Sequence, residues 1–257
     1  MDKPLANVGV LVTRPAHQAD ALCLAIEDQG GNAIRFPVLE IAPSQDQQQL
    51  LRMVDRLTDF DVAIFISPNA VHYALNVINS RTKIPPQLKF AAVGLSTAKA
   101  LRAQGRRVDI VPTDSYNSEA LLALPELQQV AGQNIVIFRG EGGRELLGET
   151  LSTRGAQVAY AECYRRVMPT ADIEPLIQLW KKSELDVIVV TSNEGLQNLY
   201  VMVGATARHW LLKTPLVVIS ERMTALAQQL EFEREPIIAH SASDEALLEA
   251  LITWRIG

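Results

Sequence analysis

Polar side chains and glycines follow several β-branched runs of this 257-residue chain, each time just before a segment with the apolar spacing of a helix. At the carboxyl ends of parallel strands, such turns present free backbone N–H groups and the positive end of a helix dipole, which bind carboxylates and phosphates. One dipole contact contributes only about 0.3–1 kcal/mol, so a ligand with many anionic groups would use several turns together. Ordinary helix capping is the alternative role for each single Ser or Thr. The turns are Thr13-Arg14, Ser67-Pro68-Asn69-Ala70, Gly94-Leu95-Ser96-Thr97, Arg139-Gly140-Glu141-Gly142-Gly143-Arg144, Ser192-Asn193-Glu194-Gly195 and Ser220-Glu221-Arg222.

The residue patterns of metal, covalent and nucleotide chemistry are missing from the sequence. The four histidines share no ligand spacing, and Cys23 and Cys163 form no C-x-x-C pair, so neither a metal site nor a disulfide framework is predicted. No serine lies in a G-x-S-x-G sequence, and Cys23 falls on an apolar helical face, which is typical of a core residue. The glycine-rich run from Gly140 to Gly143 matches neither G-x-G-x-x-G nor a Walker A sequence. We therefore expect a protein that uses no metal and no other cofactor.

The composition excludes several classes of protein. A chain that is 48% hydrophobic and 21% charged is typical of a globular protein, and its length suffices for two small domains. The formal net charge of −5 argues against a long basic surface for nucleic acid or an anionic membrane. The first residues, Met1 to Pro4, lack the regions of a signal peptide, and no apolar stretch is long enough to span a bilayer. We expect a cytoplasmic protein.

Short β-branched runs alternate with segments of helical apolar spacing, which is the pattern of βα units around a parallel sheet. The polar turns described above would then lie together at the carboxyl edge of a sheet. The predicted strands cover residues 8–13, 62–67, 90–94, 107–111, 134–139, 187–192, 216–220 and 237–239, and the predicted helices cover residues 17–29, 69–79, 96–104, 144–153, 194–203 and 222–230.

An internal repeat with an offset of about 125 residues is the most informative feature of the sequence. Any two α/β segments can match in their hydrophobic pattern alone, but here polar residues such as Asp61 and Asp186 match as well. The sequence therefore predicts a duplicated α/β unit. The matching blocks are 10–14 with 135–139, the turn at 30–31 with that at 155–156, 61–67 with 186–192 and, with one extra residue, 117–122 with 243–248.

Two extended segments, residues 36–41 and 162–167, occupy the same place in each repeat. If they pair, the chain leaves one lobe at the first segment and returns at the second, so residues 1–35 join the C-terminal half, as in domain swapping. A break near residues 128–133 would instead keep each half contiguous, and the spacing alone leaves both arrangements open. In either arrangement we expect the ligand in a cleft between two lobes.

Six short motifs keep one order and spacing along the chain, and these are Val10 to Pro15, Phe36-Pro37, Phe65 to Val71, Ala92 to Gly94, Arg139-Gly140 and Thr191-Ser192. Together they resemble the uroporphyrinogen-III synthase family over essentially the whole chain. The resemblance implies an α/β fold of two flavodoxin-like lobes, each a parallel sheet flanked by helices, joined by a two-stranded β-ladder. It favours the crossed arrangement, with lobe 1 at 1–35 and 168–257, lobe 2 at 42–161 and linker strands at 36–41 and 162–167.

The resemblance also implies a cofactor-independent lyase of haem biosynthesis. Members of the family close hydroxymethylbilane, a linear tetrapyrrole with acetate and propionate groups on every ring, to uroporphyrinogen III, with inversion of ring D and loss of water. So many carboxylates suit the anion-binding turns predicted above. We further expect a monomer that binds neither nucleic acid nor a membrane and makes a transient contact with hydroxymethylbilane synthase.

Tyr164 matches the tyrosine implicated in the family and is expected to face the cleft, where its hydroxyl would donate a proton. A phenol with a pKa of about 10 is a weak acid at neutral pH, so positioning should contribute more than acid–base chemistry. The alternative role of Tyr164 is an aromatic of the ladder that packs one lobe onto the other. The residues expected to bind the substrate are Thr13, Arg14, Ser67, Asn69, Ala70, Gly94, Ser96, Arg139, Arg144, Ser192, Asn193, Ser220 and Arg222.

Two classes of protein are alternatives to an enzyme. One is a non-catalytic two-lobed protein that closes on a small polyanionic ligand, but an exported member of that class would need a signal peptide. The other is a receiver domain, which would need clustered acidic residues at the first strand end and a phosphorylatable aspartate at a later one. Thr13-Arg14 and Ser67-Pro68 occupy those places instead. Because fold analogy does not choose among these classes, the enzyme prediction depends on the resemblance over the whole chain.

Overall fold

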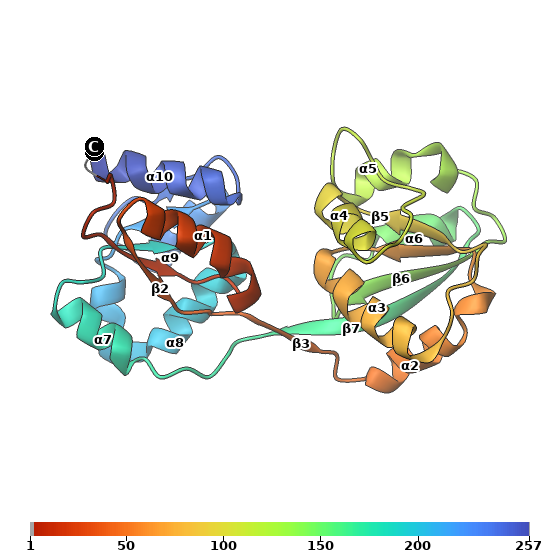
Figure 1. The fold of residues 1–257 in the computed structure, drawn as a ribbon, viewed down its shortest axis with the longest axis horizontal. Coiled ribbons are helices and arrows are strands. Elements are labelled where there is room, and N and C mark those ends of the chain that lie inside the picture. Colours follow the sequence, from red (N-terminus) through yellow and green to blue (C-terminus); the bar gives the residue numbers. More distant parts are fainter. Residues whose placement is uncertain (1–2, 257) are drawn as a thin grey trace. The chain divides into compact units, whose positions relative to one another are not determined.

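The computed structural model describes residues 3–256, which fold into two compact units (Figure 1). Unit 1 consists of the described residues up to Glu40 and from Val167 on, and unit 2 consists of Ile41–Arg166. Strand β1 (Gly9–Val12) pairs in parallel with β8 (Val187–Val189), so the first strand shares a sheet with strands from the end of the chain. A chain break near residues 128–133 therefore does not separate the units.

Unit 1 is a parallel sheet with helices on both faces. Its strands pair in the order β10-β9-β8-β1-β2, which read from the other edge is the flavodoxin-like order. Leu11 and Ile188 face α7, α8 and α9, whereas Val10 and Val189 face α1 and α10. The remaining elements are β2 (Asn32–Arg35), β9 (Leu216–Val218), β10 (Ile237–Ile238), α1 (Ala16–Asp28), α7 (Glu174–Lys181), α8 (Asn193–Leu211), α9 (Glu221–Gln229) and α10 (Asp244–Ile256).

Unit 2 repeats this architecture with the strand order β3-β7-β6-β4-β5. Phe65 and Phe138 face α2, α3 and α4, whereas Ile64 and Ile137 face α5 and α6. At the edge of this sheet β3 is hydrogen-bonded to β7, so residues 40–43 pair with the strand that ends at Val167. Of the segment expected to pair, Phe36 and Val38 donate instead to the Val12 and Thr13 carbonyls. The elements are β3 (Glu40–Pro43), β4 (Val62–Phe65), β5 (Lys89–Ala92), β6 (Asn134–Gly140), β7 (Gln157–Val167), α2 (Gln47–Asp55), α3 (Pro68–Arg81), α4 (Leu95–Ala103), α5 (Ser118–Ala123), α6 (Leu146–Thr153) and the 3-10 turns Leu57–Asp59 and Pro125–Leu127.

Equivalent hydrogen bonds recur in the two units at the predicted offset. The Asp61 carboxylate accepts the Asn134 N–H at 2.8 Å, and the Asp186 carboxylate accepts the Gly9 N–H at 2.7 Å. Helices α3 and α8 begin at residues 68 and 193, and α4 and α9 begin at residues 95 and 221. The predicted α/β class and the duplication of one sheet-and-helix unit are thus confirmed.

The predicted strand at 107–111 is wrong, because only an isolated bridge joins Ile110 to Ala91. The Asp109 carboxylate accepts the Phe90 N–H at 2.9 Å. In a regular β-ladder this N–H would instead donate to a backbone carbonyl of the neighbouring strand. The first helical stretch of α8 does end at residue 203 as predicted, because Gly204 leaves the helical conformation with φ 63° and ψ −172°, and a second stretch that was not predicted follows up to Leu211. Among the described residues, no helix is both long and apolar enough to cross a membrane.

Candidate functional site

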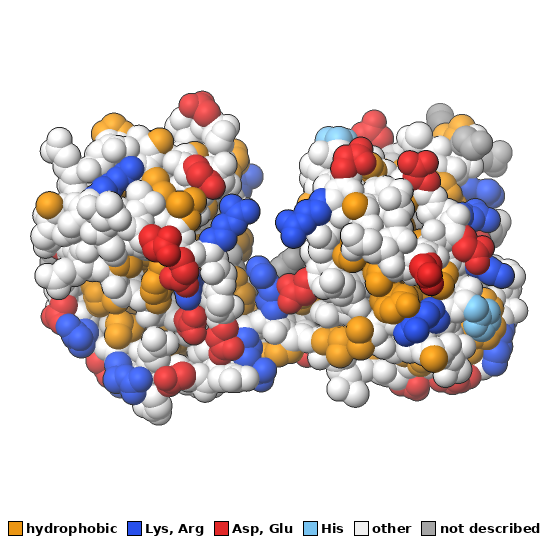
Figure 2. All heavy atoms as spheres, turned by 180° about the vertical axis from the view of Figure 1, so that it is seen from behind, with side chains coloured by type: hydrophobic (Ala, Val, Ile, Leu, Met, Phe, Trp, Pro, Cys, Tyr) orange, Lys and Arg blue, Asp and Glu red, His pale blue; other side chains and the backbone are white. Residues whose placement is uncertain are grey.

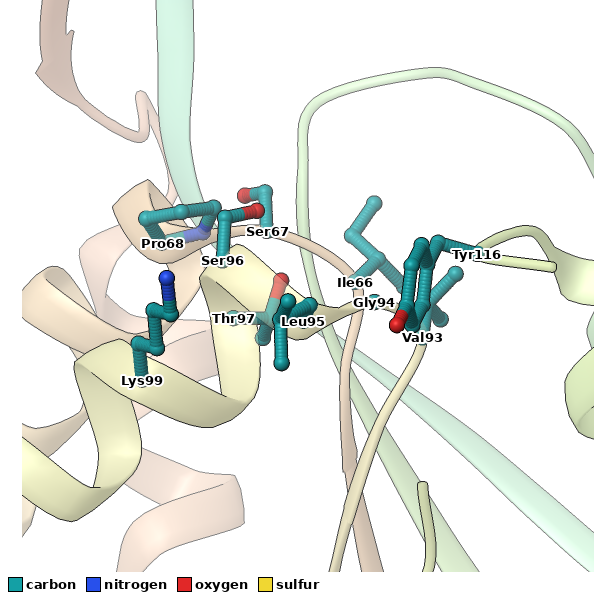
Figure 3. A pocket seen from close by; sticks show the side chains of 10 residues that line it. All are labelled: Ile66, Ser67, Pro68, Val93, Gly94, Leu95, Ser96, Thr97, Lys99 and Tyr116. Atoms are coloured by element: carbon teal, nitrogen blue, oxygen red, sulfur yellow. The ribbon is translucent and has the colours of Figure 1, made fainter. Parts of the chain in front are cut away.

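A cavity of about 440 Å³ opens at the carboxyl edge of the unit 2 sheet, where β4 and β5 end and α3 and α4 begin (Figure 3). Its apolar wall includes Ile66, Pro68, Val93 and Leu95. Its polar lining consists of the backbone at Gly94, the hydroxyl groups of Ser67, Ser96, Thr97 and Tyr116, and the ammonium group of Lys99. No carboxylate is among the ten lining residues, so the lining carries a net positive charge.

A second cavity of about 190 Å³ adjoins the first one and shares Ile66 and Val93 with it. It lies at the end of β6 and is lined by Arg139, Arg144 and Tyr160 together with the glycines 142 and 143. Two of the predicted binding residues thus come to this cavity. The two cavities form a continuous loop face at the carboxyl edge of unit 2, which is the edge where ligands of parallel sheets bind.

Ser67 caps helix α3 and also meets the predicted catalytic tyrosine. Its Oγ accepts the Ala70 N–H at 3.1 Å and lies 3.0 Å from the Tyr164 hydroxyl, and either oxygen of that pair can donate. The expected capping role and a place at the site are therefore combined in one side chain. The neighbours Asn69 and Ala70 lie in the first turn of α3 and do not line the larger cavity.

Tyr164 is buried in the core of unit 2, with 2% of its surface exposed, so its expected open position is wrong. The reason is a shift of register between β6 and β7 after Arg139, which pairs Gly140 with Tyr164. The Tyr164 ring stacks with the Tyr73 ring at 6.1 Å, and a Cβ added at Gly140 would lie 2.8 Å from it. Glycine is thus required where the strand crosses this ring. Only the hydroxyl end of Tyr164 reaches toward the cavity, through Ser67.

Arg139 is almost fully engaged within the protein. Its guanidinium donates to Glu145 at 3.1 Å and to Glu162 at 3.2 Å, and lies 4.0 Å from the centre of the Tyr160 ring. The hydrogen bond from Arg139 holds the pKa of Glu145 below its usual value. By contrast, the Arg144 side chain is 80% exposed and lies 3.7 Å from Glu119. Because exposed ion pairs are weak, Arg144 is the cation more readily available to a ligand.

The six predicted binding residues of unit 1 are not among the residues that line the two cavities of unit 2, and three of them have local partners. The buried Thr13 hydroxyl donates to the Val189 carbonyl at 2.8 Å. Arg14 pairs with Asp244 and donates to the Ala242 carbonyl. Ser192 caps α8 by accepting the Gly195 N–H at 2.9 Å. Asn193, Ser220 and Arg222 lie at the starts of α8 and α9, and Ser220 makes no side-chain capping bond.

Among the polar residues that line the two cavities, Lys99, Tyr116, Ser118 and Tyr160 were not predicted from the sequence, and Thr97 was predicted only as part of a turn. Lys99 follows Ser96 by three residues on α4, so helical spacing offers a signal for it. Tyr116 lies in the irregular segment before α5, and Tyr160 lies within a strand, where no spacing rule points to them. Cys23 is fully buried on α1, as predicted, and its burial raises the pKa of its thiol. In the part of the chain that the structure describes, no three His, Cys, Asp or Glu side chains gather as metal ligands would.

The sequence is similar to known proteins over most of its length. A family model described as "Uroporphyrinogen-III synthase HemD" matches residues 20–249. The uroporphyrinogen-III synthase of Escherichia coli K12 is 37% identical over 246 residues, which cover 95% of this chain and all of that protein. The uroporphyrinogen-III synthase of Synechococcus elongatus is 27% identical over 261 residues, which cover 98% and 97% of the two chains.

The fold is also similar to solved structures. A mutant uroporphyrinogen III synthase from Thermus thermophilus superposes with a TM-score of 0.62 at 17% identity, covering 97% of this chain and 98% of that one. The uroporphyrinogen-III synthetase of Helicobacter pylori superposes with a TM-score of 0.60 at 14% identity, covering 96% and 99% of the two chains. At such low identity these likenesses bear on the fold alone.

Proposed function

The chain belongs to the uroporphyrinogen-III synthase family, and we propose that it binds its substrate at the loop face of unit 2. As a member of this family it converts hydroxymethylbilane to uroporphyrinogen III, with inversion of ring D and loss of water, in haem biosynthesis. It is a lyase that needs no cofactor. What remains to be assigned is which residues of this chain hold the tetrapyrrole and which move protons.

The composition of the larger cavity is the observation that carries this proposal. It combines an apolar wall with hydroxyl groups, an ammonium group and the amino ends of α3 and α4, and none of its ten lining side chains is a carboxylate. A ligand that carries carboxylates on flat apolar rings matches both parts of this lining. Its volume of about 440 Å³ lies in the range of small-molecule sites, so it accommodates a part of the tetrapyrrole at a time.

Geometric control is the main contribution that we assign to the protein. Departure of the terminal hydroxyl leaves an azafulvene, and attack at the substituted carbon of ring D gives a spiro intermediate before the macrocycle closes. Closure of the same reactive species without the enzyme gives the uninverted isomer, so the protein must hold the terminal rings in the less accessible arrangement. Backbone N–H groups at the start of α4, which no side chain caps, fit this role, because fixed donors bind the ring carboxylates in one geometry.

For the proton transfers we propose a relay from Tyr164 through Ser67. Ser67 lines the cavity and is hydrogen-bonded to the buried phenol, so it can pass a proton to the departing hydroxyl while Tyr164 replaces that proton. The proton released from ring D when the macrocycle closes restores the phenol. General acid catalysis of this kind contributes about 10²–10⁴-fold, which leaves positioning as a comparable or larger effect.

Several finer expectations remain proposals of the same kind. They are the boundaries of the lobes with linker strands at 36–41 and 162–167, the binding roles of the unit 1 residues, a monomeric state, a cytoplasmic location and a transient contact with hydroxymethylbilane synthase. The two compact units support the first of these. A direct contact would suit a substrate that closes to the wrong isomer when it is free in solution.

Amide chemical shifts test the place of binding directly. Reduced uroporphyrinogen III, titrated anaerobically into ¹⁵N-labelled protein, should shift the amide signals of Ser67 and of residues 94–97 first, because these residues line the proposed site. The amino-edge residues Val62 and Lys89 of the same sheet serve as the internal reference. Saturable shifts elsewhere, with Ser67 and residues 94–97 unmoved, would place the site on another surface of the protein.

A further inference from the structure

Tyr116 and Lys99 line the larger cavity, and both side chains are exposed. The Tyr116 hydroxyl donates to the Thr113 carbonyl at 3.3 Å within its own loop. Tyr116 lies in the loop before α5 and is 51% exposed, although it is a large aromatic side chain. A Cβ added at Gly94 would lie 3.3 Å from the Tyr116 Cβ, so the loop is held close against the start of α4. Figure 3 shows the Tyr116 ring on one side of the cavity, with its flat face beside Gly94 and Val93.

Lys99 supplies the positive charge of this cavity. It is exposed on α4, one turn after the residues that begin the helix, and Figure 3 shows its ammonium end directed toward Pro68 and Ser96. Within residues 3–256, the structure gives Lys99 neither an ion pair nor a hydrogen bond through its side chain. With no carboxylate in the lining, this charge has no counterpart inside the cavity.

Thr97 adds a further hydroxyl group to the lining. The residue as a whole is buried, with 2% of its surface exposed, and the structure gives its hydroxyl no hydrogen bond to any of the described residues. The hydroxyl oxygen is not one of the buried side-chain atoms without a partner, so it is itself accessible from the cavity. Figure 3 shows this oxygen on the side where Ser67 and Ser96 lie, where a ligand carboxylate would accept its hydrogen bond.

From these contacts we propose that Tyr116 and Lys99 clamp one pyrrole ring of the substrate and thereby help to determine which isomer forms. The Tyr116 ring stacks on the face of the pyrrole, the Lys99 ammonium pairs with one of its acidic side chains, and the Thr97 hydroxyl hydrogen-bonds the same carboxylate. This inference rests on the proposed function and extends it by two residues that hold the substrate without taking part in proton transfer.

The clamp acts on binding and on geometry. Tyr116 and Lys99 lie at separate sides of the cavity. A pyrrole ring between them can stack its flat face on the phenol ring. The acetate and propionate groups extend beyond the edge of the pyrrole and can then reach Lys99. Contacts of this kind stabilise the bound substrate and the transition state alike, so their loss raises KM more than it lowers kcat. Substrate that is bound less often closes in solution instead, which increases the share of the uninverted isomer.

Steady-state kinetics together with the isomer ratio test this inference in the full-length protein. Lys99→Gln should raise KM about threefold to fivefold, as expected for an exposed charge pair, and Lys99→Arg should largely restore it. Tyr116→Ala should raise KM about threefold to tenfold, whereas Tyr116→Phe keeps the stacking ring and should stay near the wild-type value. The matched control is Lys89→Gln, an exposed lysine at the opposite end of β5, which should change neither quantity.

The outcomes separate the clamp from the proposed function itself. If the wild-type protein forms no uroporphyrinogen III, the proposed function fails before any variant is compared. If the wild type forms it, and Lys99→Gln and Tyr116→Ala keep wild-type KM and isomer ratio at substrate concentrations below KM, the clamp is wrong while the function stands. A matching rise in KM for Lys89→Gln would also overturn the clamp, because it would assign the effect to overall charge. Circular dichroism melting curves establish that each variant is folded.

Discussion

At the scale of single residues, the contact between Ser67 and Tyr164 links the core of unit 2 to its loop face. The phenol is almost fully buried and stacks with Tyr73, so its ring has a structural role whatever its hydroxyl does. The hydroxyl, however, meets a residue that lines the larger cavity. The ring therefore packs within unit 2, and the proposed catalytic role falls to the hydroxyl alone.

Replacing only the hydroxyl separates these two roles. Tyr164→Phe keeps the buried ring but removes the hydrogen bond to Ser67, so we expect a lower kcat with residual activity and a stability loss of about 1 kcal/mol. The matched control is Tyr73→Phe, which removes the hydrogen bond to the Ile41 carbonyl from the stacked neighbour and should spare kcat. Measurement of kcat and of urea denaturation on both variants gives the comparison. A wild-type kcat in Tyr164→Phe would remove the phenol from the mechanism.

Arg139 is expected to act on stability more than on binding. Arg139→Gln loses two carboxylate hydrogen bonds and the contact with the Tyr160 ring, and should destabilise the protein by about 1–3 kcal/mol at neutral pH. The exposed Arg144 is the matched control, and Arg144→Gln should change the free energy of unfolding by no more than about 0.5 kcal/mol.

The pH dependence of the Arg139→Gln effect follows from Glu145. Arg139 lowers the pKa of Glu145 in the folded protein, so this pairing stabilises the fold above the usual carboxyl pKa and is lost as the pH falls through the lowered value. The difference in stability between wild type and Arg139→Gln should therefore shrink toward acid pH. Urea denaturation at a series of pH values measures it, and a difference that grows as the pH falls would contradict this assignment.

At the scale of the elements, the two halves of the chain share turn geometry as well as helices and strands. Gly30 and Gly155 follow α1 and α6 with φ values of +87° and +88°, a conformation that favours glycine. This equivalence was visible in the sequence as the matched turns of the repeat. The same local constraint thus ends the same helix in both units.

A substitution at Gly155 tests the turn. Gly155→Ala should destabilise the protein by about 1–2 kcal/mol, because a Cβ is disfavoured at positive φ. Gly155→Asn should lose less, since asparagine tolerates such a conformation better than alanine does. Thermal or urea denaturation of the two variants makes the comparison, and an alanine variant as stable as the wild type would show that the turn relaxes to another conformation.

The accuracy of the sequence prediction depended on how local each signal was. Strands such as β4 and β6 were predicted because both of their faces are buried and their apolar runs are continuous. Helices α2 and α7 were not, because both are short, with nine and eight residues, and α2 begins with three glutamines, so few apolar positions report their helical spacing. The place of Tyr116 at the cavity depends on the path of the loop before α5. The burial of Tyr164 depends on the register shift between β6 and β7. No spacing rule in the sequence predicts either feature.

At the scale of the whole molecule, each unit has a sheet with both faces covered by its own helices. Unit 2 is also continuous in sequence, whereas the sheet of unit 1 combines β1 and β2 with strands from the end of the chain. The proposed site lies wholly within the continuous unit. Acidic and basic side chains are interspersed on both units in the face shown in Figure 2, so the positive cavity is a local feature of a chain with net negative charge.

Unit 2 should therefore fold on its own. A fragment of residues 41–166 contains β3 to β7 and α2 to α6 almost completely, so we expect cooperative thermal unfolding and dispersed amide signals. The comparison is a fragment of residues 1–126, which breaks the sheets of both units and should not unfold cooperatively. A 41–166 fragment without a cooperative transition would show that unit 2 depends on the rest of the chain for its stability.

The isomer composition of the product shows whether this chain forms the inverted tetrapyrrole. Purified protein is added to freshly generated hydroxymethylbilane without metal or cofactor, and the uroporphyrin isomers are separated after oxidation. We expect a dominant type III product, with the share of type I falling as more protein is added. Type I product alone, formed in the presence of folded protein at every concentration, would contradict it and favour a non-catalytic protein that binds a polyanion.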